Sequence, residues 1–109
     1  MINENITPNE VWNDGRTIHL YCNDLVGQYT AYGTSAYLVC RAMDVPPFFS
    51  EDAQMPAVII NTPLLEVLKQ QCQVVHSERS YCCMETTPEA NEDDYAEWVE
   101  YVRGKWLVT

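Results

Sequence analysis

The stretch Gln28-Tyr29-Thr30-Ala31-Tyr32-Gly33-Thr34-Ser35-Ala36 decides the fold, because it turns a strand directly into a helix. The predicted strand runs from Gln28 to Tyr32, and Gly33 ends it by permitting a backbone conformation that other residues rarely adopt. Thr34 or Ser35 has the hydroxyl needed to cap the free N–H groups of the helix that follows.

That helix is predicted to begin with Ala36 and to continue to about Met43, because Pro46-Pro47 forbids further helix. The segment Phe48 to Gln54 carries two aromatic and two acidic residues and is expected to be a loop. Met55 to Ile60 is a continuous apolar run, which suits a strand at the centre of a sheet.

On the N-terminal side, Thr17 to Cys22 alternates between apolar and polar positions, as a half-buried strand requires. Asn23-Asp24 and Gly27 supply the turn residues that lead back into the Gln28 strand. Before Thr17 the chain is polar and rich in Asn, and Asn13-Asp14-Gly15 is a turn signal.

On the C-terminal side, Thr62-Pro63 predicts a helix start, with the Thr62 hydroxyl as the cap and Pro63 in the first turn. This helix is expected to end near Gln71 to Gln73. Val74 to His76 and Ser80 to Glu85 are expected to form one or two further strands, with a bend or bulge at Ser77 to Arg79 between them.

The last predicted element is an amphipathic helix from Glu89 to Lys105. Its apolar positions repeat with helical spacing at Tyr95, Trp98, Val99, Val102 and Trp106. Acidic residues in its first turns and basic residues in its last turn complement the helix dipole.

Together these elements predict a single α+β domain, in which a mixed β-sheet is flanked by helices and followed by an acidic C-terminal helix. Residues 1–15 are a lead-in, residues 16–87 form the α+β core, and the helix in 88–109 packs on the same domain. With 47% hydrophobic residues, the chain of 109 residues has enough apolar material to fold alone.

The net charge of the chain narrows the range of binding partners that we expect. Six Lys and Arg against sixteen Asp and Glu give a formal net charge of −10, and such a surface repels the phosphate backbone of nucleic acids. Another protein is therefore the expected partner. The acidic residues also serve solubility alone, so the charge does not identify that partner.

The N-terminus resembles no secretion signal, and no apolar run approaches the roughly 20 residues that span a bilayer. The chain is therefore expected to be cytoplasmic. Its five cysteines are odd in number and lie mostly within apolar runs, which favours reduced core thiols over disulfides. They are Cys22, Cys40, Cys72, Cys82 and Cys83.

The order of the central elements resembles the N-terminal, mismatch-reading domain of the MutS family of DNA repair proteins. The matching segments are Ile18 to Tyr21, Gln28 to Ala36, Met55 to Val58, Thr62 to Gln71 and Tyr81 to Glu85. The resemblance implies a MutS domain I-like fold. At the positions of the family's intercalating Phe and base-contacting Glu stand Gln28 and Thr30, so we expect mismatch reading to be lost.

Several residue groups are candidates for a site, each with a simpler structural explanation. Cys82-Cys83 with His76 and His19 has zinc-ligand chemistry, but adjacent strand residues point to opposite faces and no metal-ligand spacing is present. A Cys–His nucleophilic pair has no local signature either. No cofactor, metal or catalytic residue is therefore predicted.

Two surfaces remain as candidates for binding. The first is a nucleic-acid or partner surface, on which aromatic rings could stack bases but could equally pack the core. Its residues are Gln28, Tyr29, Thr30, Tyr32 and Arg41. The second is an acidic partner face on the C-terminal helix, which could also be a plain solvated face. Its residues are Glu92, Asp93, Asp94 and Glu97.

The adjacent aromatic residues of Pro46-Pro47-Phe48-Phe49 must either close the core or contact a partner. The function expected from these observations is a non-enzymatic interaction module. The alternatives are a nucleic-acid-associated accessory protein similar to DNA repair proteins and, below it, an acidic DNA mimic or a cysteine-dependent enzyme.

Overall fold

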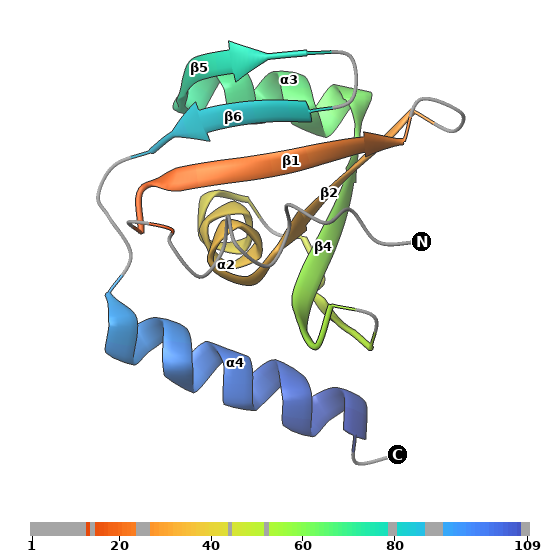
Figure 1. The fold of residues 1–109 in the computed structure, drawn as a ribbon, viewed down its shortest axis with the longest axis vertical. Coiled ribbons are helices and arrows are strands. Elements are labelled where there is room, and N and C mark those ends of the chain that lie inside the picture. The colour runs from red at the N-terminus through yellow and green to blue at the C-terminus, as the bar shows by residue number, and fades with distance from the viewer. Residues whose placement is uncertain are drawn as a thin grey trace.

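The computed structural model describes residues 13, 15–23, 27–43, 45–51, 53–78, 81–86 and 91–107, with the backbone alone for Asn23, Trp106 and Leu107. Within these residues a six-stranded sheet packs against three helices (Figure 1). Most of the predicted lead-in 1–15, the 24–26 turn and the segment Pro88-Glu89 lie outside the described residues.

Three pairs of consecutive strands build the sheet, and each pair is joined by a short connection. The strands are β1 (Thr17–Asn23), β2 (Gln28–Tyr32), β3 (Phe48–Ser50), β4 (Met55–Asn61), β5 (Gln73–Ser77) and β6 (Tyr81–Glu85). Helices link one pair to the next. They are α2 (Gly33–Ala42) and α3 (Thr62–Gln71), and α4 (Glu92–Leu107) follows β6.

The strand order is β3-β4-β2-β1-β6-β5, and every pairing among these strands is antiparallel. The α+β class is therefore confirmed, whereas the expectation of a mixed sheet is wrong. The reason is that the sheet consists of hairpins, and the linking helices bring neighbouring hairpins together in antiparallel orientation as well. No parallel crossover is formed between adjacent strands described here.

The core lies between one face of the sheet and the helices α2 and α3. Ile18 and Leu20 on β1 are fully buried, and β6 places Met84 and Cys82 opposite them. Leu38 and Val39 of α2 and Leu65 and Leu68 of α3 join the same cluster. Burying a side chain of this size contributes about 1.5–3 kcal/mol, so this face holds the domain together.

The junction between β2 and α2 differs in one detail from the prediction. Gly33 has a φ of 54°, as the predicted unusual backbone conformation requires, but the helix already begins there. Tyr32 is the N-cap residue and makes no capping hydrogen bond with its side chain, so the prediction of a Thr34 or Ser35 cap is wrong. The Ser35 hydroxyl instead accepts a hydrogen bond from the backbone N–H of His19 on β1, at 2.9 Å.

The start of α3 needs a similar correction. The backbone N–H of Leu64 donates to the side-chain oxygen of Asn61 at 3.0 Å, so Asn61 is the cap and Thr62 is the first helical residue. Pro63 lies in the first turn as predicted. The side chain of Asn61 fits this role as well as that of Thr62, and the helix simply begins one residue earlier than expected.

The segment predicted as a loop contains a short strand. Phe48 and Phe49 pair with Ala57 and Pro56 of β4, which makes β3 one edge of the sheet. At the other edge, the register between β5 and β6 shifts between Val74 and His76. This irregularity lies inside β5, whereas part of the connection at Ser77 to Arg79, where a bend or bulge was predicted, lies outside the described residues.

The C-terminal helix is confirmed, with bounds of Glu92–Leu107 in place of Glu89 to Lys105. Its start is fixed by Asn91, whose side-chain oxygen accepts from the backbone N–H of Asp93 at 2.8 Å. Tyr95 and Trp98 place their rings 6.0 and 5.3 Å from the ring of Tyr37 on α2. Val102 is buried, so the apolar face packs on the domain as predicted.

None of the helices in the described part of the chain is long and apolar enough to cross a membrane.

Candidate functional site

The face of the sheet opposite the core carries a cluster of aromatic side chains. His19 and Tyr21 on β1, Tyr32 on β2 and Tyr81 on β6 form this outer-face cluster, which strand alternation and the β1–β6 register bring together. The rings of Tyr21 and Tyr81 lie 5.6 Å apart, and those of Tyr21 and Tyr32 lie 6.0 Å apart. These spacings are typical of favourable aromatic contacts.

Polar contacts hold the cluster in place. Nδ1 of His19 is hydrogen-bonded to the Tyr81 hydroxyl, and their rings stack with centroids 5.9 Å apart. Tyr21 is only 8% exposed, while the other three members are half-buried. Most of the ring surface is consequently buried by packing within the sheet. A ligand could contact the exposed edges of Tyr32, Tyr81 and His19.

The predicted surface Gln28 to Tyr32 with Arg41 is divided between the two sides of the sheet. Thr30 pairs with Tyr21 and with Ile59, which places Gln28, Thr30 and Tyr32 on the outer face. Tyr29 packs against the core cluster on the opposite face. Arg41 belongs to α2, where its guanidinium lies 5.7 Å from the ring centroid of Tyr37. The five residues therefore do not form one surface.

The adjacent cysteines also point to opposite faces, as their position on a strand predicts. Cys82 is buried in the core, whereas Cys83 is half-buried and has His19 and His76 as its neighbours on the two flanking strands. His76 lies 3.2 Å from the carboxylate of Glu78. No group of three His, Cys, Asp or Glu within the described residues is arranged to hold a metal ion.

Burial makes two of the thiols difficult to ionise. It raises the pKa of the Cys40 thiol to about 11, and Cys40 Sγ lies 3.4 Å from the Val45 carbonyl oxygen. Burial also raises the pKa of Cys82, although Lys69 and a hydrogen bond with Ser77 oppose the increase. Because the thiolate is the nucleophilic form, these two cysteines are poorly suited to covalent catalysis at neutral pH.

The acidic residues of α4 are exposed, and some of them line up along one side of the helix. Asp93, Glu97 and Glu100 follow i, i+4 and i+7 spacing and so form one stripe, opposite the face that contacts Tyr37. Glu92 and Asp94 lie on either side of it. Glu100 was not among the predicted residues of the acidic face, although the 3.6-residue period would have identified it.

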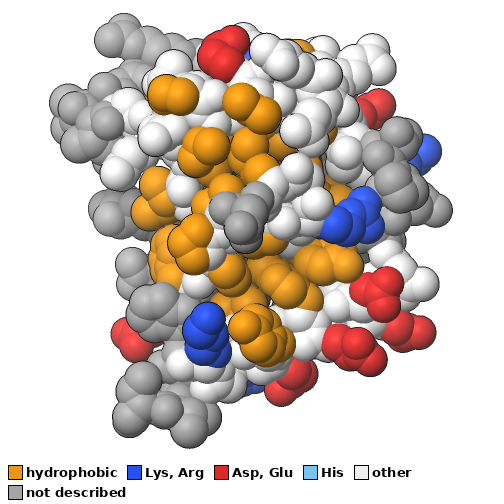
Figure 2. All heavy atoms as spheres, turned by 180° about the vertical axis from the view of Figure 1, so that it is seen from behind, with side chains coloured by type: hydrophobic (Ala, Val, Ile, Leu, Met, Phe, Trp, Pro, Cys, Tyr) orange, Lys and Arg blue, Asp and Glu red, His pale blue; other side chains and the backbone are white. Residues whose placement is uncertain are grey.

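A band of hydrophobic side chains runs across the side on which α3 lies, and Figure 2 shows acidic side chains at its lower margin, where α4 begins. Half-buried apolar residues of α2, α3 and α4 pack on the core, among them Ala42, Leu64 and Trp98. Tyr101 of α4 is 61% exposed. Phe49 is half-buried in β3, and the guanidinium of Arg103 lies 5.9 Å from its ring centroid.

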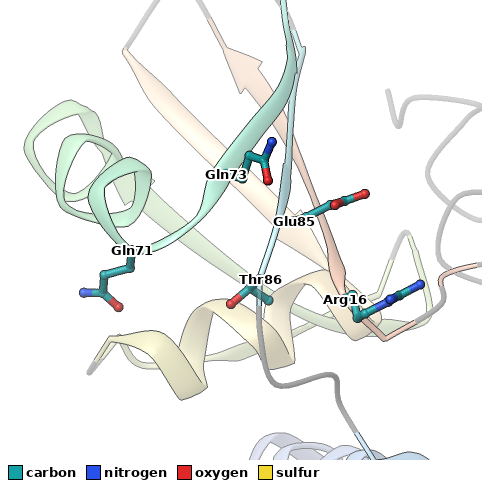
Figure 3. A pocket seen from close by; sticks show the side chains of 5 residues that line it. All are labelled: Arg16, Gln71, Gln73, Glu85 and Thr86. Carbon is teal, nitrogen blue, oxygen red and sulfur yellow. The ribbon is translucent and has the colours of Figure 1, made fainter.

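A polar pocket of about 290 Å³ lies where several elements end (Figure 3). Gln71 comes from the end of α3, Gln73 from the start of β5 and Glu85 from the end of β6. Thr86 directly follows β6, and Arg16 precedes β1. The pocket presents two amides, one hydroxyl and one charge of each sign. This lining provides hydrogen bonds without a nucleophile paired to a base.

No protein-family model matches the chain, and no curated protein or solved structure is detectably similar to it.

Proposed function

We propose that this protein is a non-enzymatic interaction module that binds a basic amphipathic segment of another protein through α4. The acidic stripe Asp93, Glu97 and Glu100 is the observation that carries the proposal. Within the described residues these three carboxylates have no cationic partner, since the ion pairs there are Lys69–Glu66 and His76–Glu78.

The stripe has no evident structural purpose beyond the first helical turn. Negative charges in the first turn stabilise a helix through its dipole, which accounts for Glu92, Asp93 and Asp94. Glu97 and Glu100 lie beyond that turn. Like charges at i, i+3 and i, i+4 positions instead destabilise a helix, by about 0.2–0.5 kcal/mol for each pair. Binding of a cationic partner would turn this cost into favourable contacts.

The neighbouring hydrophobic band indicates what else the partner carries. Tyr101 lies beside the stripe on α4 and is 61% exposed. Figure 2 shows acidic side chains next to the apolar band. A segment with basic residues on one side and apolar residues on the other would match both features. Charge complementarity of this kind accelerates association and weakens with salt.

The proposal is tested by nuclear magnetic resonance titration with a synthetic amphipathic helix of Lys and Leu and with a scrambled peptide of the same composition. We expect the amphipathic peptide to shift the amide signals of α4, and the affinity to fall when salt rises from about 50 mM to about 300 mM. Neutralising the stripe as Asp93→Asn, Glu97→Gln and Glu100→Gln should weaken binding about tenfold or more.

The control removes three exposed carboxylates from elsewhere, as Glu51→Gln, Glu66→Gln and Glu78→Gln. It changes the net charge equally and should keep the affinity within about twofold, because the net charge acts only weakly at a distance in salt. Equal weakening in both triple variants would show that the peptide responds to net charge alone and would contradict the proposal.

A second candidate is nucleic-acid association through the outer face. Tyr32, Tyr81 and His19 are half-buried rings on one sheet face, and such rings can stack unpaired bases. The MutS resemblance of the sequence is a further reason for this candidate, because the residues that it aligns with the mismatch-reading positions, Gln28 and Thr30, lie on this face. The net charge of −10 opposes this function.

Fluorescence anisotropy with single-stranded, paired and mismatched DNA at about 50 mM salt decides this second candidate, since phosphate contacts are strongest there. Binding that Tyr32→Ala weakens and Tyr29→Ala leaves unchanged would favour the outer face. Absence of binding to all three DNAs would remove the candidate.

A further inference from the structure

The two edge strands of the sheet, β3 and β5, differ in how well they are protected from pairing with another strand. β3 has three residues, follows Pro46-Pro47 and is contacted by α4 through Arg103 and Phe49. β5 has five residues, and it lies at the margin of the sheet with no described strand beyond it (Figure 1). Proteins usually shorten, charge or cover an edge strand, because its unpaired N–H and C=O groups attract another strand.

The side chains of β5 do not protect this edge. All five are exposed, and Val74 and Val75 are 40% and 55% exposed. The sequence Gln-Val-Val-His-Ser contains neither Pro nor Lys, and it contains no carboxylate in a chain that has sixteen. The bulge at Val75 bends the strand without adding a charge to it.

We propose that β5 is a self-association edge, at which two copies of this chain pair antiparallel about a two-fold axis and continue the sheet across both molecules. Centred on Val75, this register places Val75 opposite Val75 of the second copy and Val74 opposite His76. The backbone of Gln73 then lies opposite that of Ser77, while the bulge turns their side chains to different faces, Gln73 beside Glu85 and Ser77 beside Cys82. Val75, which is 55% exposed, then packs against its copy.

The same register keeps like charges apart. Glu78 is the acidic residue closest in sequence to β5, and in the antiparallel pair the two Glu78 residues lie at opposite ends of the shared ladder. With a rise of about 3.4 Å per residue they are roughly 20 Å apart, about twice the Debye length at 0.1 M salt. β5 is therefore a place where two acidic molecules can meet without facing carboxylates.

The affinity of this self-association should depend on salt concentration in a characteristic direction. Each copy carries a net charge of −10, and repulsion between whole molecules opposes pairing at low salt. The edge itself contributes backbone hydrogen bonds and apolar contacts, which salt does not screen. Self-association should therefore strengthen as salt rises, whereas binding of a basic segment to α4 should weaken. The two proposals can fail independently.

Sedimentation velocity of the full chain is the experiment. A five-residue edge is small beside the roughly 800 Å² per partner of a standard interface, so we expect a dissociation constant on the order of 100 μM. The sedimentation coefficient should rise from the monomer toward the dimer value between about 20 μM and about 1 mM, and more so at about 500 mM than at about 50 mM salt.

Val75→Lys places a charge on the edge and should weaken the dimer about tenfold or more. Val67→Lys is the matched control, because Val67 is 43% exposed on α3 and the change in net charge is the same. Circular dichroism checks that both variants are folded. Hydrogen exchange of the unmodified chain provides a test without substitutions, since backbone amides within 73–77 should gain protection as the concentration rises.

Dimerisation that Val75→Lys weakens and Val67→Lys does not, with added protection within 73–77, supports the proposal. A chain that stays monomeric up to about 1 mM at both salt concentrations overturns it. Dimerisation without added protection in β5 also overturns it, because the interface would then lie elsewhere.

Discussion

The Ser35 hydroxyl, on the first turn of α2, lies 2.9 Å from the backbone nitrogen of His19 on β1 and accepts its hydrogen. The β1–β2 pairing begins only at Tyr21 and Thr30, because the chain leaves β2 after Tyr32 to form the helix. Ser35 thus continues the hydrogen bonding of β1 where β2 has ended. It is fully buried and also lies 3.4 Å from the side-chain nitrogen of Asn13.

Ser35→Ala is therefore expected to lower the free energy of unfolding by about 1–3 kcal/mol, the usual cost of leaving a buried donor unsatisfied. Thr34→Ala, one residue earlier and half-buried, is the control and should cost less. Urea denaturation of the three proteins measures both effects. Equal stability of Ser35→Ala and the unmodified protein would contradict a structural role for this hydrogen bond.

Asn61→Ala should remove the cap of α3 and lower stability by about 1 kcal/mol. Thr62→Ala at the neighbouring position should cost much less, because the side chain of Thr62 caps nothing and is exposed. Thermal denaturation distinguishes the two. A larger loss for Thr62→Ala would instead favour the cap that the sequence alone predicted.

Gly104→Ala should raise stability by about 0.5–1 kcal/mol, because glycine is costly within a helix and a Cβ at this position meets nothing within 4 Å. Gly27→Ala is the matched contrast. Its Cβ is equally unobstructed, but Gly27 has a φ of 64° and an alanine there is strained, so stability should fall. Chemical denaturation gives both values, and changes of the same sign would contradict the explanation.

The Cys40 thiol should make stability depend on alkaline pH. Its pKa is about 11 in the folded protein against an ordinary value of 9.0, because burial disfavours the thiolate. The folded state therefore holds this proton more tightly than the unfolded state does. The stability that this thiol contributes is complete below pH 9 and is lost as pH rises toward about 11. Cys40→Ala should flatten the decline of unfolding free energy over this range, whereas an unchanged slope would exclude Cys40 as its source.

The parts of the fold that could be predicted depend on residues close together in the sequence. Gly33 marked the strand-to-helix junction, and the spacing of Tyr95, Trp98 and Val102 marked the buried face of α4. The short strand at Phe48 was missed because its pairing with Ala57 depends on a partner outside the local pattern. Similarly, nothing local in the sequence indicated that Ser35 would bond to β1 instead of capping its own helix.

The same limit applies to the candidate site. Strand alternation predicted that Cys82 and Cys83 face opposite sides, but the neighbours of Cys83 depend on long-range register. His19 stands beside Cys83 only because β1 pairs with β6. The acidic residues of α4 were recognised from composition, whereas the stripe that includes Glu100 follows from helix geometry, which the sequence could have supplied.

The position of β1 in the sheet has a consequence for how the protein is made. Among the strands that the structure describes, β1 is the first and β6 is the last, and the two pair from Thr17 with Glu85 to Tyr21 with Tyr81. At roughly 5 to 20 residues per second, a ribosome reaches β6 several seconds after β1. During that time Ile18 and Leu20 lack Met84 and Cys82, so a nascent chain stalled before Tyr81 exposes the centre of its own core.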